Sequence, residues 1–84
     1  MKLVWDESAW EDYLWWQAQD RKVLKRINTL IADIARNGNE GIGKPEPLKH
    51  ALAGSWSRRI DESNRLVYVA DVQHVTILQA RYHY

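Results

Sequence analysis

A carboxylate, an imidazole and two cations in the second half of this sequence are residue types that together can cleave RNA without a metal ion. Glu46 is suited to take the proton from a ribose 2′-OH, which then attacks the adjacent phosphate, and His83 is suited to protonate the departing 5′ oxygen. Lys49 and Arg65 are fixed cations that would stabilise the negative charge of the transition state. A fold that brings these four side chains together would be a candidate nuclease.

Each of these residues also has an ordinary structural explanation. Glu46 can be a loop charge in solvent, and Lys49 and Arg59 can be surface cations of the kind found in most proteins. Arg65 follows a turn in which residues 61–62 are both acidic, so it can simply pair with that turn. Because the residues lie far apart in sequence, spacing alone leaves both interpretations open.

The sequence shows no pattern typical of metal ligands. His50, His74 and His83 are scattered and form no HExxH or comparable motif, and there is no cysteine to make a disulfide or a thiolate zinc site. We therefore expect no metal and no cofactor, and we expect His50 and His74 to have no functional role.

The length of 84 residues indicates one domain, residues 1–84, near the lower limit for a stable core without disulfides. No apolar run approaches the roughly 20 residues that span a bilayer. The segment Met1–Trp5 is followed at once by two acidic residues, which does not fit a signal peptide. We expect a soluble cytoplasmic protein that does not associate with membranes.

Basic residues are enriched in the second half of the chain. Residues 1–43 hold six Lys/Arg and seven Asp/Glu, whereas residues 44–84 hold six and four, so the two halves carry −1 and +2 and sum to the net +1. If the later cations share a face, they form a modest phosphate-binding surface; the alternative is a solvated strand surface. These cations are Lys44, Lys49, Arg58, Arg59, Arg65 and Arg81.

Two amphipathic helices are expected in the first half. Ser8 and Glu11 have capping-box spacing, so the first helix should begin near Asp6 or Ser8. Asp20 is a favourable N-cap for the second helix, whose apolar residues recur at a 3.6-residue period as far as Gly38, a C-cap signal. The very short joint between the two patterns predicts a helical hairpin.

The rest of the chain reads as strands around one long loop. Residues 38–55 contain four glycines and two prolines and are expected to form a loop with a helical turn at Leu48–Leu52. Strict alternation in the last strand would place Arg81 and His83 on one face. The predicted strands are Lys2–Trp5, Ser55–Ile60, Arg65–Asp71 and His74–His83.

The order β-α-α-β-β-β predicts an α+β fold. The strands should form a small antiparallel sheet of three or four strands. The helical hairpin should cover one face of this sheet and leave the other open.

Several segments resemble the YoeB toxins of the RelE/ParE superfamily. The most specific are Gly41–His50, which reads GIGKPEPLKH, and Arg81–Tyr84, which reads RYHY; Trp56–Ile60 and Arg65–Tyr68 also match. The resemblance extends over essentially the whole chain. It implies a RelE-like, microbial-RNase-like endoribonuclease that acts on mRNA in the A site of a translating ribosome.

The resemblance also implies partners. A YefM-like antitoxin would neutralise the toxin by covering its site, and the complex would repress its own operon, with operator DNA contacted only through the antitoxin complex. A homodimer is a further possibility that this resemblance raises. An acidic antitoxin segment would suit the basic half of the chain.

The resemblance assigns roles to individual positions. Glu46 would be the general base, His83 the general acid, and Arg65 the stabiliser of the phosphorane. Tyr84 would orient the scissile region. The residues expected to bind phosphate or hold the message are Lys44, Lys49, Arg59 and Arg81.

The sequence departs from the family pattern at one turn. Relatives often carry an acidic residue at the position of Ser63 and a histidine at that of Asn64. Any supporting role of the acidic residue is therefore in doubt in this chain. Two other functions remain open: that of a gyrase-poisoning relative, which acts by binding alone, and that of an inactive RNA- or antitoxin-binding module. The presence of Glu46, Arg65 and His83 argues against the first.

Overall fold

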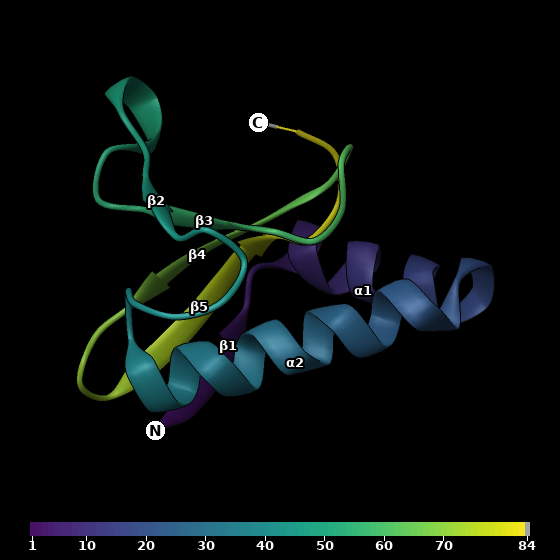
Figure 1. Cartoon of the computed structure of the whole chain (residues 1–84), viewed down its shortest axis with the longest axis horizontal. Helices are drawn as coiled ribbons and strands as arrows, with labels where there is room; N and C mark the ends of the chain where they lie inside the picture. Colours follow the sequence, from purple (N-terminus) through teal and green to yellow (C-terminus); the bar gives the residue numbers. More distant parts are fainter. Residues whose placement is uncertain (84) are drawn as a thin grey trace.

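Two helices lie side by side against one face of a five-stranded sheet (Figure 1). The computed structural model describes residues 1–83. Within these residues no helix is long and apolar enough to cross a membrane. In chain order the elements are β1 (Lys2–Trp5), α1 (Glu7–Gln19), α2 (Arg21–Asn37), β2 (Glu46–Pro47), the 3₁₀ helix η1 (His50–Leu52), β3 (Trp56–Arg59), β4 (Arg65–Ala70) and β5 (His74–Gln79).

The predicted α+β class and the helical hairpin on one sheet face are confirmed, but the sheet is larger and mixed. Its order is β1-β5-β4-β3-β2, and β1 pairs with β5 in parallel while the other pairs are antiparallel. A parallel pair needs a crossover between its strands, and the helical hairpin lies in the connection from β1. The fifth strand, β2, is two residues long and includes Pro47, which has no N–H to donate and suits an edge strand.

The two helices begin at aspartates. The carboxylate of Asp20 accepts hydrogen bonds from the backbone N–H groups of Lys22 and Val23, as predicted for the N-cap of α2. Asp6 caps α1 in the same way, by accepting from the N–H of Ser8 at 3.3 Å. The predicted capping box is wrong, because the Ser8 hydroxyl donates to Asp6 at 2.7 Å instead.

The core lies between α2 and the middle of the sheet. Ile27, Leu30 and Ile34 recur at helical spacing and are all fully buried. They pack against sheet residues such as Leu66 and Ile77, which are also fully buried. Burying each such side chain stabilises the fold by roughly 1.5–3 kcal/mol. The core therefore fixes the sheet face that carries Leu66 and Ile77 and leaves the opposite face free for other residues.

Candidate active site

The strand register gathers predicted site residues on the sheet face opposite the helices. Glu46 of β2 pairs with Ser57 of β3, and Arg59 of β3 pairs with Arg65 of β4. Directly paired residues project to the same side of a sheet, and residues alternate along β3. Because Arg58 is buried on the helix side, Glu46, Ser57, Arg59 and Arg65 share the other face, which we call the open face because the helices do not cover it (Figure 1). Ser57 is fully buried even on this face.

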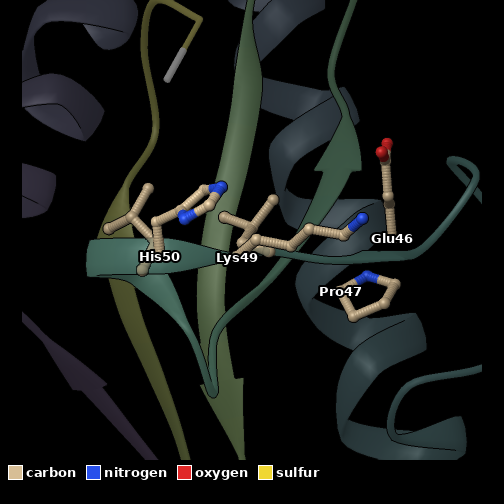
Figure 2. Close-up of a pocket in the computed structure, with 6 residues that line it drawn as sticks. Glu46, Pro47, Lys49 and His50 are labelled. Atoms are coloured by element: carbon tan, nitrogen blue, oxygen red, sulfur yellow. The ribbon is translucent and has the colours of Figure 1, made fainter.

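The segment after β2 builds a hollow beside Glu46. Its volume is about 350 Å³. Figure 2 shows the ammonium of Lys49 lying between the Glu46 carboxylate and the His50 imidazole. Lys44 and His50 have φ angles of 51° and 59°, a region that L residues rarely adopt and that is often found at functional sites. The hollow is lined by Glu46, Pro47, Leu48, Lys49, His50 and Leu52.

The cations of the candidate site have no ion-pair partner among residues 1–83. In this part of the chain the ion pairs are Arg58 with Asp33 and His74 with Asp71. The site cations without one are Lys44, Lys49, Arg59, Arg65 and Arg81. Positive charge that no protein carboxylate neutralises remains available for an anionic ligand.

Arg65 stands out because its Nε is buried and has no hydrogen-bond partner in the described part of the chain. A buried donor without a partner costs roughly 1–3 kcal/mol, so an anion that reached this group would relieve the cost. The expected alternative, an ion pair with the acidic turn, is not formed. Asp61 instead accepts hydrogen bonds from the backbone N–H groups of Ser63 and Asn64, both at 2.8 Å.

The last strand is shorter than predicted, and Arg81 does not share a strand face with His83. β5 ends at Gln79, and Tyr82 has a φ of 66°, so alternation stops before these residues. The Arg81 guanidinium lies 3.4 Å from the ring centroid of Trp15 on α1. This cation–π contact holds Arg81 on the α1 side.

The C-terminal segment lies beside the turn between β3 and β4 (Figure 1), and hydrogen bonds join the two. The N–H of Tyr82 donates to the side chain of Asn64 at 2.7 Å, and the N–H of Arg65 donates to the Tyr82 carbonyl at 2.9 Å. His83 is exposed and directly follows Tyr82, whose carbonyl accepts the hydrogen bond from Arg65. Tyr84 lies outside the described residues.

Arg58 does not belong to the predicted basic surface. It is fully buried, pairs with Asp33, and donates to the carbonyls of Gly38, Glu40 and Ile42 at 2.7, 3.0 and 2.9 Å. The hydrogen bond from Arg58, the largest cause, holds the pKa of Asp33 below its ordinary value. Arg58 therefore fastens the loop that leads into β2. Sequence reasoning could have found this, because consecutive arginines in a strand must point to opposite faces.

Residues 1–83 contain no group of three or more His, Cys, Asp or Glu side chains placed to hold a metal ion. His74 lies at the far end of β5, where it pairs with Asp71 at 3.6 Å. His50, by contrast, lines the hollow next to Lys49.

Solved structures of other toxins share this fold. The YoeB/ParE toxin from Agrobacterium tumefaciens has the same fold, with a TM-score of 0.96 and 46% identity over the full length of both chains. YoeB from the YoeB–YefM heterotetrameric complex of Staphylococcus aureus gives a TM-score of 0.92 at 47% identity and covers 100% of this chain and 98% of that one. The fold is thus that of the RelE-like toxins.

The toxin YoeB of Escherichia coli K12 is 55% identical over all 84 residues, covering 100% of both sequences. The model of the YoeB-like toxins of bacterial type II toxin–antitoxin systems matches residues 5–84. This chain belongs to that family.

Proposed function

We propose that this toxin is a ribosome-dependent mRNA endonuclease that cuts the message in the A site and so stops translation. The observation that carries the proposal is the open face. Its register combines one carboxylate, Glu46, with two arginines that have no ion-pair partner among residues 1–83, Arg59 and Arg65. The C-terminal segment brings His83 to the same end of β4 as Arg65.

The reaction follows from these side chains. Glu46 takes the proton of a ribose 2′-OH, and the resulting oxygen attacks the adjacent phosphorus. The guanidinium of Arg65 stabilises the added negative charge of the phosphorane. His83 gives a proton to the 5′ oxygen as the P–O bond breaks. The products are a 2′,3′-cyclic phosphate and a 5′-OH.

Further residues hold the message. Lys44, Lys49 and Arg59 contact phosphates around the cut, and Tyr84 orients the scissile region. Arg81, stacked on the Trp15 ring, reaches RNA only from the α1 side, so its contribution is to binding. Several cations around a single carboxylate give a positively charged surface, which suits a polyanionic substrate.

The ribosome supplies what the site lacks. The hollow of about 350 Å³ beside Glu46 cannot enclose a length of RNA chain. Holding a message at a fixed position converts a bimolecular encounter into an effectively unimolecular step, which can account for several orders of magnitude in rate. A message fixed in the A site needs only the catalytic groups, and these are what the open face offers.

A YefM-like antitoxin is the proposed partner. The Staphylococcus aureus relative was solved as a complex with YefM, and that organism's YoeB also as a dimer. We infer that an acidic antitoxin segment covers the cations of the open face, because these charges lack intramolecular partners. The complex would bind operator DNA through the antitoxin and repress its operon, and the toxin would also form a homodimer.

The mechanism is tested with a defined message that carries a single 2′-deoxy nucleotide on the 5′ side of the cut. Purified ribosomes hold this message and an all-ribose control with the same codon in the A site, in the presence of Mg²⁺. We expect the control to be cut, leaving a 2′,3′-cyclic phosphate, and the deoxy message to stay intact, because the nucleophile is missing. Cutting of the deoxy message, or a 5′-phosphate product, would contradict the mechanism.

The same assay separates catalysis from binding. His83→Ala should abolish cutting, whereas the matched variant His74→Ala, at the first residue of β5, should cut like the wild type. Translation blocked equally by wild type and His83→Ala, with the message intact, would mean that the protein acts by binding alone.

A further inference from the structure

Three hydrogen bonds fix Tyr82 in the C-terminal segment, two with Asn64 and Arg65 where the turn after β3 enters β4 and one with Gln79 at the end of β5. The Tyr82 N–H donates to Asn64 Oδ1 at 2.7 Å. The Tyr82 carbonyl accepts from the Arg65 N–H at 2.9 Å and from Gln79 Nε2 at 3.3 Å. Both backbone polar groups of Tyr82 are therefore fixed, one residue before His83.

The Asn64 amide is held in the orientation that this contact needs. Its Nδ2 donates to both carboxylate oxygens of Asp61, at 3.0 and 3.2 Å. A carboxylate only accepts, so the amide must present its NH₂ to Asp61 and its oxygen to Tyr82. Asp61 is fixed in turn by the backbone N–H groups of Ser63 and Asn64.

The backbone of Tyr82 has an unusual conformation that depends on such support. Its φ of 66° is in the left-handed region, which a tyrosine rarely adopts. A residue stays there only when its surroundings determine it, and here the surroundings are Asn64, Arg65 and Gln79. The direction in which the chain continues to His83 is set by this conformation.

We propose that Asn64 is a positioning residue: with Asp61 behind it, Asn64 fixes Tyr82 and thereby sets the position of His83 relative to Arg65. The effect on cleavage rests on the proposed function, whereas the effect on the C-terminal segment does not. The same turn supplies Arg65 itself as the residue after Asn64. One hydrogen-bonded unit thus links the residue proposed to stabilise the transition state with the residue proposed to donate the proton.

Three variants of the full chain test the proposal. Asn64→Leu removes the side-chain hydrogen bonds to Tyr82 and to Asp61 at similar size, and Asn64→Asp keeps the acceptor for the Tyr82 N–H but loses the donor to Asp61. The matched control is Asn28→Leu, which loses a bond of the same length, 2.7 Å from Tyr13 Oη, between the two helices. Thermal unfolding of each variant gives its melting temperature alongside the other measurements.

The first measurement is NMR relaxation of the backbone amides of Tyr82 and His83. We expect order parameters to fall from about 0.85 in the wild type to below about 0.6 in Asn64→Leu. Asn64→Asp should give an intermediate value, and Asn28→Leu should leave both amides as in the wild type. Unchanged order at Tyr82 in Asn64→Leu would overturn the proposal, whatever the cleavage rate.

The second measurement is the steady-state rate of cleavage on programmed ribosomes. A positioning role predicts that Asn64→Leu lowers kcat by roughly 10- to 100-fold, while the half-saturating ribosome concentration changes less than about threefold. Asn64→Asp should recover part of kcat. If the order parameters of Tyr82 and His83 fall in Asn64→Leu but kcat stays unchanged, the positioning role is overturned. If the wild type itself does not cut, the proposed function fails and the relaxation data alone decide whether Asn64 holds the segment.

Discussion

Arg58 and Arg59 are neighbours in sequence with opposite surroundings. Alternation along β3 turns Arg58 into the core, where it pairs with Asp33, and Arg59 to the open face, where it has no ion-pair partner among residues 1–83. Sequence reasoning named Arg59 as a phosphate-binding candidate and placed Arg58 in the same basic group. The second assignment failed because charge counting does not distinguish the two faces of a strand.

The Arg58–Asp33 pair predicts an acid-dependent loss of stability. The pKa of Asp33 is lowered from 3.8, chiefly by the hydrogen bond from Arg58. The ionised pair therefore stabilises the folded state fully above the unfolded pKa of the carboxyl, and this stabilisation is lost as pH falls below 3.8 through the folded value.

Thermal melts of the wild type and Asp33→Asn between pH 7 and pH 2 check this. The wild type should melt higher near neutral pH, and the difference should shrink as pH falls below about 4. A difference in melting temperature that stays constant down to the lowest pH would show that the charge of Asp33 does not contribute.

At the scale of elements, the conformation of the loop between α2 and β2 depends on its packing against the Arg58–Asp33 ion pair. A Cβ added at Gly41 would lie 2.0 Å from Asp33 Oδ2, and Gly41 has a φ of 132°. The carboxylate cannot simply move away, because it also accepts from the Ile42 N–H at 3.1 Å. The loop in turn leads to Lys44 and Glu46, so its packing bears on the site.

Gly41→Ala and Gly54→Ala make a matched pair that tests this packing. Gly54 also has a positive φ, 94°, but a Cβ there meets nothing within 4 Å. Gly54→Ala should cost only the backbone strain, about 1–3 kcal/mol. Gly41→Ala should lower the melting temperature at least about twice as much, because it also displaces the partner of the buried Arg58. An equal loss of melting temperature in the two variants would mean that the loop does not depend on the Arg58–Asp33 pair.

The helices were predictable from sequence, whereas the sheet edges and the C-terminal segment were not. Asp20 and Gly38 bound α2 as their local chemistry indicates. β2 has two residues, too few to show alternation, and the pairing of β1 with β5 joins positions about 70 residues apart. The end of β5 is set by distant contacts: the Ala80 N–H donates to Asp12 at 3.0 Å, and its carbonyl accepts from Trp16 Nε1 at 2.8 Å.

At the scale of the whole molecule, the core and the proposed site lie on opposite faces of the sheet. One face packs on the helices, and the other combines Glu46, Arg59 and Arg65, which sequence reasoning identified by residue type but could not bring together. The register supplied that step, because paired residues share a face. The molecule extends only 31 × 27 × 24 Å, so a deep substrate cleft would remove much of the core. This size fits the proposal that the ribosome, rather than the toxin, positions the RNA.

The most direct test of this account is the rate of cutting of one message, free and held in the A site, measured by primer extension for the wild type and His83→Ala. We predict that ribosomes raise the wild-type rate by at least about 10³-fold, because they supply the orientation that the open face lacks, and that His83→Ala cuts neither form. Equal rates on free and ribosome-bound message, or cutting by His83→Ala at the wild-type rate, would contradict the account.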